Sequence, residues 1–364
     1  MSTGRLLPFR RGGRWGYLYA EGATQGEVAI EPRFAEAADF HEGLARVNVG
    51  EAYEDDSDQV VGRWGFIDAS GSFRLDPEYD GAGDFSDSLA CVNVGATKGY
   101  AAYEGRYFIT GGRWGFVDAK GWHIPAKYES ASNFSEGLAA VRTDEKYGYV
   151  DRTDQLIIEH RFRSGGQFRE GLATVSVSVG QKDVHGYVDR GGKLVIEPRW
   201  RLAYPFSEGL GLVLDGATYR YLFLDPGGGV AVRLPPSIGH AYAFSEGLAM
   251  ASVTEIRAFN DGSGFYPMSG GRFGFADRSG SFVIEPQLEW ASSFSGGLAP
   301  AKKGGRCGYI DRTGSFIVAP QFDGTGPVKG GLGQVTLGKD VFYLDLRNYR
   351  PGDRAILQPR MLRP

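Results

Sequence analysis

Acidic side chains recur at one fixed place in this chain and are the first candidates for chemistry. An Asp ends each of eight short apolar runs, and a group of carboxylates could in principle bind a metal or act as acid and base; the eight are Asp68, Asp118, Asp151, Asp189, Asp225, Asp277, Asp311 and Asp345. Gly, Ser or Thr usually follows within three positions, which is typical of an Asp that caps its own turn. We therefore expect these residues to form turns.

Nothing else in the sequence has the spacing of a known catalytic site. The histidines and cysteines are dispersed, so neither a metal-binding group nor a disulfide framework is indicated; they are His41, His123, His160, His185, His240, Cys91 and Cys307. The runs H-E-x-x-H, C-x-x-C, G-x-S-x-G and G-x-x-x-x-G-K-[ST] are absent. We expect a protein that is not an enzyme and holds no metal and no cofactor.

The acidic residues belong to a unit that recurs along the chain. The run Gly-Arg-Trp-Gly followed by an aromatic residue stands at 13–17, 62–66 and 112–116, and weaker copies follow downstream. The basal period is about 34 to 38 residues, which is typical of arrays in which each unit buries an apolar face of its neighbour. Nine copies fit residues 1–364 with nothing left over. We expect a single array and no appended catalytic domain.

Each copy can be divided into three strands. The first follows Gly-Leu-Ala, as at 138–141; the second is the Trp-Gly run; the third ends at Glu-Pro, as at 281–285. Alternating apolar residues with β-branched and aromatic side chains favour strands in all three places. The sequence predicts an all-β fold of nine three-stranded antiparallel repeat units in an open, twisted, solenoid-like array. The alternative is a closed ring like a β-propeller, whose blades typically have four strands.

Aromatic residues at two positions after each Glu-Pro pair are expected to form the core. An apolar residue lies two positions after the proline and a Phe lies about eight positions after it; the Phe series is Phe40, Phe85, Phe134, Phe168, Phe206, Phe244 and Phe294. Burial of one such side chain contributes about 1.5–3 kcal/mol. The repeated Trp and Gly are also expected to pack between units, because a Gly inside a strand indicates a close approach of another segment. A ligand cage of Trp15, Trp64 and Trp114 is the alternative.

Three elements in fixed order carry a resemblance to a known family. The Arg-Trp-Gly-Phe-Ile-Asp run, the Val-Ile-Glu-Pro run at 195–198 and 283–286, and the Phe-Ser-Glu-Gly-Leu-Ala run at 134–139 and 244–249 resemble the WG-containing repeat family of bacterial proteins. The resemblance covers essentially the whole chain. It implies a β-rich binding or scaffolding protein and no particular reaction.

Three copies are longer than the others, and all three insertions fall between the first and second strands. They are residues 51–61, 96–111 and 255–270. Insertions at one point of a repeat map to one face of an array, which is often the binding face. The first is acidic, with Asp55, Asp56 and Asp58, but it lacks the Gly and the distal Glu of a calcium-binding EF-hand loop.

Aromatic residues in these insertions are the candidate partner-binding residues, because Tyr and Phe bury a large area with little loss of rotamer entropy. The set is Tyr53, Tyr100, Tyr103, Tyr107, Phe108, Phe259, Phe265 and Tyr266. The alternative is that the insertions are long hairpins that pack on themselves. We expect a non-enzymatic scaffold that binds a protein or peptide; the alternatives are a carbohydrate-active enzyme or carbohydrate-binding protein, and a purely structural spacer.

Charge and hydropathy exclude two classes of partner. The formal net charge of −4 provides no positive field for a phosphate backbone, so we expect no nucleic acid. No stretch approaches about 18 apolar residues, and the first residues lack the apolar core of a signal peptide, so we expect no membrane contact and a cytoplasmic location. An upstream signal that has been removed is the alternative.

Overall fold

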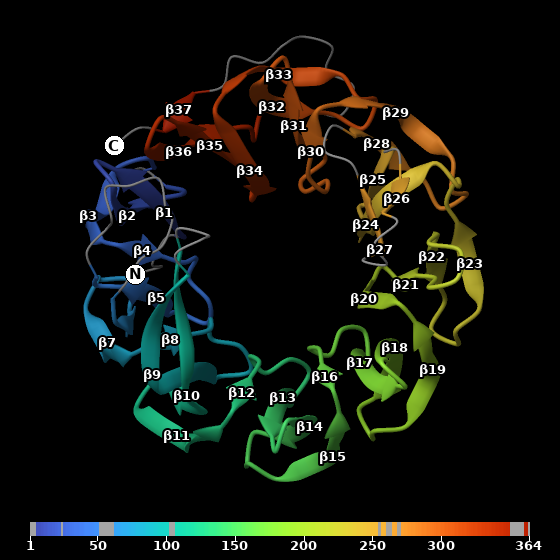
Figure 1. Ribbon diagram of the computed structural model, residues 1–364. Coiled ribbons are helices and arrows are strands. Elements are labelled where there is room, and N and C mark those ends of the chain that lie inside the picture. Colours follow the sequence, from blue (N-terminus) through green and yellow to red (C-terminus); the bar gives the residue numbers. More distant parts are fainter. Residues whose placement is uncertain are drawn as a thin grey trace. The chain divides into compact units, whose positions relative to one another are not determined.

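The computed structural model describes residues 5–22, 25–50, 62–101, 106–253, 256–259, 264–267, 271–349 and 360–362. For residues 98–101, 106–109, 256–259 and 264–267 it describes the backbone alone. The chain divides into two compact units: the first is Met1–Ser176 with Asp189–Lys193 and Arg363–Pro364, and the second is Val177–Val188 with Leu194–Leu362. Every regular element in the described residues is a β-strand (Figure 1), so the all-β prediction is confirmed.

The first unit contains three complete four-stranded antiparallel sheets in its described residues. They are β4–β7, β8–β11 and β12–β15, each in chain order, and the antiparallel strands β1–β3 precede them. The bounds are β1 (Leu6–Arg11), β2 (Arg14–Tyr19), β3 (Val28–Phe34), β4 (Glu36–Ala37), β5 (Ala45–Asn48), β6 (Trp64–Ile67), β7 (Phe73–Tyr79), β8 (Gly81–Ala82), β9 (Ala90–Ala101), β10 (Arg106–Asp118), β11 (Gly121–Tyr128), β12 (Ser130–Ala131), β13 (Leu138–Thr143), β14 (Lys146–Asp151), β15 (Leu156–Phe162), β16 (Ser164–Gly165) and β17 (Leu172–Val179), which begins in this unit.

The second unit repeats this plan. Its described residues form the sheets β20–β23, β24-β25-β28-β29 and β30–β33, and β34–β37 pair antiparallel after them. The bounds are β18 (Lys182–Asp189), β19 (Leu194–Trp200), β20 (Leu202–Ser207), β21 (Leu210–Leu214), β22 (Tyr221–Leu224), β23 (Val230–Arg233), β24 (Ile238–Ser245), β25 (Leu248–Val253), β26 (Ile256–Phe259), β27 (Gly264–Pro267), β28 (Arg272–Ala276), β29 (Phe282–Leu288), β30 (Trp290–Ala291), β31 (Ala299–Lys303), β32 (Arg306–Ile310), β33 (Phe316–Phe322), β34 (Gly324–Lys329), β35 (Leu332–Leu337), β36 (Asp340–Asp345) and β37 (Met361–Leu362).

The predicted three-stranded unit is wrong in its strand count, because each complete sheet begins with a further strand. In β4, β8, β12 and β30 this strand has only two residues. In the β12–β15 sheet, Ser130 pairs with Arg142 and Ala131 pairs with Val141. Two residues carry no alternating pattern, so only their backbone pairing with the next strand defines them. The strand expected at 355–359 lies outside the described residues.

The third and fourth strands of each sheet form the hairpin that the sequence predicted. β6 pairs with β7, and the register shifts on either side of Phe66. A Cβ added to Gly65 would lie 2.8 Å from the carbonyl oxygen of Leu75 and 2.9 Å from the nitrogen of Pro77. The repeated Gly therefore lets the last strand approach the Trp-Gly strand closely, as predicted.

The Phe-Ser-Glu-Gly-Leu-Ala runs form tight turns that lead into the second strand of each sheet. Glu136 and Gly137 both have positive φ, of 55° and 82°. Ser135 and Leu138 exchange two backbone hydrogen bonds of 2.9 and 3.2 Å. Two consecutive residues with positive φ between a hydrogen-bonded pair are typical of a type I′ turn.

The acid in this turn also joins one sheet to the next. Glu136 accepts a hydrogen bond at Oε2 from the backbone nitrogen of Gly171 at 3.0 Å. In the second unit, Glu208 accepts one from Gly247 at 3.0 Å. The carboxylate therefore satisfies a backbone donor in the turn of the following sheet, in addition to shaping its own turn.

The core lies between successive sheets of each unit. One cluster joins β4–β7 to β8–β11 and another joins β8–β11 to β12–β15. The ring that follows the motif Gly packs on a Phe of the second series: Phe116 lies 4.7 Å from Phe134 and Phe66 lies 5.0 Å from Phe85, between ring centroids. All members of that series are buried except Phe40, which is half-buried, so the core prediction is confirmed.

Candidate functional sites

The eight recurring Asp residues cap their own turns, as predicted. In each case Oδ1 accepts a hydrogen bond from the backbone nitrogen two residues later; the distances are 2.9 Å for Asp68, 2.7 Å for Asp118, 2.8 Å for Asp151, 3.0 Å for Asp189, 2.8 Å for Asp225, 2.8 Å for Asp277, 2.9 Å for Asp311 and 3.2 Å for Asp345. Six of them also accept from the residue four positions later. These carboxylates are used locally as turn acceptors.

Hydrogen bonding stabilises the charged form of some of these acids. The hydroxyl of Ser70 and two backbone nitrogens hold the pKa of Asp68 below its usual value. The hydroxyl of Ser279 and the neighbouring backbone nitrogens lower the pKa of Asp277 in the same way. A general base needs a pKa near the working pH, so a lowered pKa suits a structural anion better.

The three motif Trp residues do not form a shared cage. Trp15, Trp64 and Trp114 are each half-buried, and each packs against a different core cluster. The guanidinium of Arg46 lies 4.9 Å from the ring centroid of Trp64. The packing interpretation of these residues is therefore confirmed.

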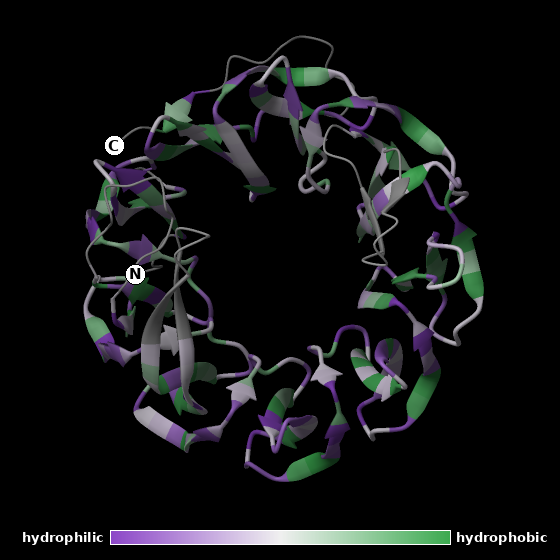
Figure 2. Ribbon diagram, in the orientation of Figure 1, coloured by the Kyte–Doolittle hydropathy of each residue, from purple (hydrophilic) through white to green (hydrophobic). Residues whose placement is uncertain are grey.

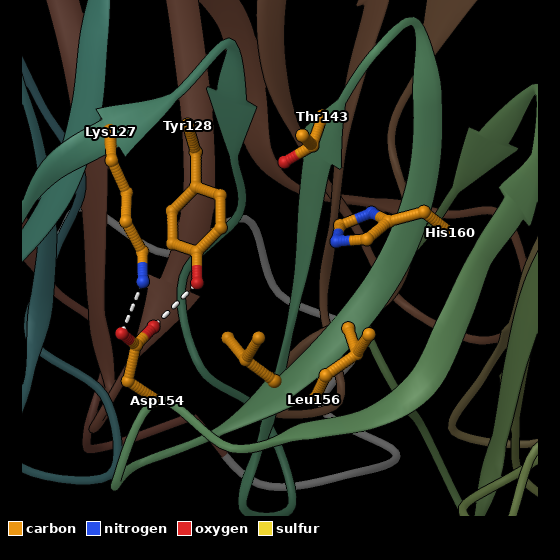
Figure 3. Close-up of a pocket in the computed structure, with 7 residues that line it drawn as sticks. Lys127, Tyr128, Thr143, Asp154, Leu156 and His160 are labelled. Atoms are coloured by element: carbon orange, nitrogen blue, oxygen red, sulfur yellow. Dashed lines mark hydrogen bonds and ion pairs between the residues drawn. The ribbon is translucent and has the colours of Figure 1, made fainter.

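A pocket of about 390 Å³ lies between the β8–β11 and β12–β15 sheets of the first unit. Its lining residues come from the end of β11, from β13, from β14 and the turn after it, and from β15; they are Lys127, Tyr128, Thr143, Val150, Asp154, Leu156 and His160. Figure 3 shows Tyr128 on one side and His160 on the other, with Leu156 below them. Volumes of this order are typical of small-ligand sites.

One side of this pocket is fixed by a carboxylate. Asp154 accepts a hydrogen bond at Oδ1 from the hydroxyl of Tyr128 at 2.5 Å, and its Oδ2 pairs with the ammonium of Lys127. Burial and this hydrogen bond raise the pKa of Tyr128, so the phenol stays protonated. Both oxygens of Asp154 are engaged, and the ring of Tyr128 is thereby held in one orientation.

The other side of the pocket presents hydrogen-bonding groups. The Nδ1 atom of His160 lies 3.3 Å from the carbonyl oxygen of Lys146. A carbonyl can only accept, so Nδ1 carries a proton and Nε2 is an acceptor in the neutral ring. Figure 3 shows the hydroxyl of Thr143 above the space between Tyr128 and His160.

The 96–111 insertion lengthens the β9–β10 hairpin into a two-stranded arm. The backbone pairing continues outward from Val94 opposite Arg113 to Ala101 opposite Arg106. Tyr100 stands opposite Tyr107 in this register, and Phe108 stands opposite Gly99. Tyr103 lies outside the described residues. Three of the predicted partner-binding residues are therefore brought to one ribbon of the backbone.

The base of this arm is fixed to the sheets. Asn93 is buried, and its Nδ2 donates to the carbonyl oxygen of Gly111 at 3.3 Å. Asp80 accepts at Oδ2 from the backbone nitrogen of Ala96 at 2.9 Å and pairs with Arg63 at 2.5 Å. The arm therefore begins from a rigid stem.

The other two insertions occupy the same topological place. The connection from β5 to β6 holds residues 51–61, including Tyr53, which lie outside the described residues. In the second unit, the connection from β25 to β28 forms the hairpin β26–β27, in which Phe265 stands opposite Ala258, Tyr266 opposite Arg257 and Phe259 opposite Gly264. All three insertions join the second and third strands of a sheet, which correspond to the first two strands predicted from the sequence.

A further pocket of about 740 Å³ lies at the base of the arm, and its lining residues are Val94, Gly95, Gly111, Gly112, Arg113, Glu129, Arg142 and Glu145. Among the described residues, no group of three or more His, Cys, Asp or Glu could hold a metal ion. In the same part of the chain no helix is long and apolar enough to cross a membrane. The two cysteines are unpaired and buried, and burial raises the pKa of Cys91 to about 12.

The repeat pattern matches a known family over more than half of the chain. Seven segments fit the model described as WG containing repeat: residues 24–53, 64–96, 114–147, 147–178, 186–219, 273–307 and 308–339. The chain belongs to the WG containing repeat family. Each matched segment begins in or near a Trp-Gly strand or its hairpin, so a WG repeat extends across the boundary between consecutive sheets.

Comparisons beyond the WG repeats are weak. No curated protein matches the chain. Similar solved structures include Hsv2p of Kluyveromyces lactis (8% identity, 73% of this chain and 94% of that chain, TM-score 0.39), AztD of Citrobacter koseri (12%, 97% and 95%, 0.38) and the tricorn protease (11%, 94% and 41%, 0.38). Likenesses of this strength carry no argument about function.

The pocket of Figure 3 is not among the sites predicted from the sequence. Its residues lie in two consecutive WG repeats, and no single motif contains them. A signal was nevertheless present, because one repeat has Asp154 in place of the turn Gly and His160 in place of the Pro of Glu-Pro. Departures of this kind from an otherwise regular repeat could have indicated the site.

Proposed function

We propose that this WG-repeat protein is a non-enzymatic scaffold that binds a protein or peptide partner through its insertions. The observation that supports it best is the 96–111 arm. The backbone pairing of the arm brings Tyr100, Tyr107 and Phe108 to one two-stranded ribbon, and aromatic residues are enriched at protein interfaces. A fixed stem at Asn93 and Asp80 reduces the entropy lost on binding.

The recurring acids favour a scaffold over an enzyme. Eight Asp residues accept hydrogen bonds from their own turns, and the carboxylate in the pocket is engaged by Lys127 and Tyr128. Glycoside hydrolysis would need two carboxylates facing one cleft at about 5–10 Å. The pocket of Figure 3 has one carboxylate, Asp154. We place the protein in the cytoplasm, with no nucleic acid, membrane or cofactor among its partners, as the sequence predicts.

A clean deletion of the arm tests this proposal. Val94 and Arg113 are paired, and Gly95 and Gly112 both have positive φ, of 76° and 70°. Removing residues 96–111 would join these two glycines into a two-residue type I′ turn, which fits the existing strands without strain. We expect the deletion variant to fold and to lose the partner that the full chain captures from its native cell extract.

A second variant separates loss of contacts from loss of the arm. Replacing Tyr100, Tyr103, Tyr107 and Phe108 together by Ser keeps the length of the arm and removes its predicted partner-binding side chains. We expect this variant to lose the same partner in the same capture experiment, quantified by mass spectrometry. Retention of the partner by both variants would place the binding surface elsewhere.

The arrangement of the array is part of the same proposal. Successive sheets pack face to face within each unit. The open array expected from the sequence and a closed ring differ in their largest dimension and in their central density. The pair-distance distribution from small-angle X-ray scattering of the full chain distinguishes them.

A further inference from the structure

The last strands of consecutive sheets leave a notch between them. Each notch is the space between the end of one last strand and the start of the next. In the first notch, Phe73 at the start of β7 packs on Phe34 at the end of β3, with ring centroids 6.3 Å apart and planes at 86°. In the second, Trp122 in β11 packs on Tyr79 in β7 at 5.9 Å and 84°. In each of these two notches, an aromatic side chain packs edge-to-face on the last residue of the preceding strand.

The third notch has the same framework without the ring. Leu156 is equivalent to Phe73 and Trp122 in the hairpin register. Leu156 stands opposite Val150, Phe73 stands opposite Ile67, and Trp122 stands opposite Val117. A Leu is smaller than either aromatic residue and lacks a ring. The pocket of about 390 Å³ beside Tyr128 occupies this third notch.

Two departures from the repeat line the same pocket. Asp154 stands where the Asp-x-x-Gly turn has Gly, and it keeps a positive φ of 67°. His160 stands where Glu-Pro has Pro. A non-Gly residue with positive φ costs free energy, and such costs are concentrated at functional sites. Two departures within seven residues, Asp154 and His160, therefore line one cavity.

We propose that this pocket binds the aromatic side chain of a Tyr or Trp residue from a peptide partner. The ring would take the place that Phe73 and Trp122 fill in the first and second notches, edge-to-face with Tyr128 and in contact with Leu156 and Val150. Its phenol hydroxyl or indole nitrogen would donate a hydrogen bond to Nε2 of His160. The hydroxyl of Thr143 provides a second polar contact (Figure 3).

The polarity of the pocket selects among aromatic residues. In the neutral ring of His160, with Nδ1 donating to Lys146, Nε2 is an acceptor and favours aromatic residues that carry a donor, and Phe has none. The pocket shares no lining residue with the 96–111 arm, so this inference goes beyond the proposed function and does not depend on it. Loss of the arm should leave binding to the pocket unchanged.

Peptide titration of the full chain tests the proposal. The probes are capped five-residue glycine peptides with Tyr, Phe or Leu in the middle, together with N-acetyl-tyrosinamide. Binding is followed by isothermal titration calorimetry in every variant and, where His160 is present, also by the NMR resonances of its imidazole. We expect the Tyr peptide to bind at least about tenfold more tightly than the Leu peptide, and about threefold to tenfold more tightly than the Phe peptide.

Two matched variants connect the binding to the notch. Leu156→Phe supplies the missing ring from within, and we expect it to weaken the Tyr peptide at least about tenfold. Ile157→Phe adds the same ring at the next, exposed position and should change the affinity less than about twofold. His160→Ala should remove the preference for Tyr over Phe while leaving the preference for Phe over Leu.

Several outcomes would overturn the proposal. Equal binding of the Tyr and Leu peptides would show that no aromatic site exists. Unchanged binding by a folded Leu156→Phe variant would place the peptide outside the notch. Binding of N-acetyl-tyrosinamide without binding of the Tyr peptide would identify a small-molecule site and exclude a peptide side chain.

Discussion

The notch between β7 and β11 is closed by Trp122 packing on Tyr79, whereas the notch between β11 and β15 has Leu156 beside Tyr128 and stays open. In both hairpins the residue before the turn Asp stands opposite this position, Val117 opposite Trp122 and Val150 opposite Leu156, although the turn before Trp122 is one residue shorter. This register position is aromatic in some hairpins and aliphatic in others, as at Leu194 and Val230, so the absent ring alone does not make a site. Beside Leu156 the absent ring coincides with new polar groups at Asp154 and His160, which makes the open notch suited to a ligand with both a ring and a donor.

The largest expected effect comes from the core beneath this open notch. Phe134 is fully buried, packs on Phe116, and belongs to the cluster that contains Tyr128. We expect Phe134→Ala to lower the free energy of unfolding by about 3–5 kcal/mol. Urea denaturation measures it, with Ile157→Ala as an exposed control that should cost less than about 1 kcal/mol. Equal losses of stability in the two variants would show that the buried and the exposed positions have been assigned wrongly.

Opening the closed notch should have a smaller effect. Trp122 is 47% exposed and makes one edge-to-face contact with Tyr79. We expect Trp122→Leu to cost about 0.5–1.5 kcal/mol, the usual size of an aromatic pair interaction. Leu156→Phe should change stability by a similar amount in the opposite direction. If both substitutions destabilise the protein in urea denaturation, the two notches are not equivalent.

Restoring the turn Gly in the open notch should have a smaller effect still. Asp154→Gly relieves a positive φ of 67° but removes the partners of Lys127 and Tyr128. Each effect is about 1 kcal/mol and their signs are opposite, so we expect a net change within about 0.5 kcal/mol. Asp154→Asn, which keeps a side chain at positive φ without a charge, is the control. A loss above about 2 kcal/mol would mean that the carboxylate is essential to the fold.

The smallest expected effect is the pH dependence of an exposed turn that is common to open and closed notches. The pKa of Asp277 is lowered in the folded state, first by the hydroxyl of Ser279 and then by backbone nitrogens. A lowered pKa means that its stabilising effect is complete above the unfolded pKa, near 3.8, and is lost as the pH falls through the folded pKa. The difference in thermal stability between the wild type and Asp277→Asn should therefore be constant above about pH 5 and shrink below about pH 4. A difference that grows on acidification would contradict it.

The local parts of the fold could be predicted from the sequence because their causes are local. An Asp followed by small residues caps a turn within four positions, and a Gly such as Gly65 is required where a neighbouring strand approaches. The Phe series is periodic, so its burial follows from the period alone. Each of these signals is complete within one repeat.

The two-residue strands and the pocket of Figure 3 could not be predicted, because they depend on contacts between separate segments of the chain. The two-residue strand β12 exists only because Ser130 and Ala131 pair with β13. The contact of Lys127 with Asp154 joins positions 27 residues apart in different sheets. No motif spans such a distance. The candidate aromatic residues of the arm were found by composition, and Tyr100 and Tyr107 are now known to be opposite one another in the backbone register.

Hydrogen bonds join the turn before the second strand of one sheet to the equivalent turn of the next sheet, and these links give the array a direction. In every described link the acceptor belongs to the earlier sheet and the donor to the later one: Glu42 to Ser88, Asp87 to Gly137 and Glu136 to Gly171 in the first unit, and Glu208 to Gly247 and Glu246 to Gly297 in the second. An added copy of the repeat would therefore supply a carboxylate that accepts from the turn of the following repeat. It would also supply a backbone N–H that donates to the turn of the preceding repeat. Such a chain can grow or shrink by whole repeats without leaving a charge or a donor unsatisfied at the junction.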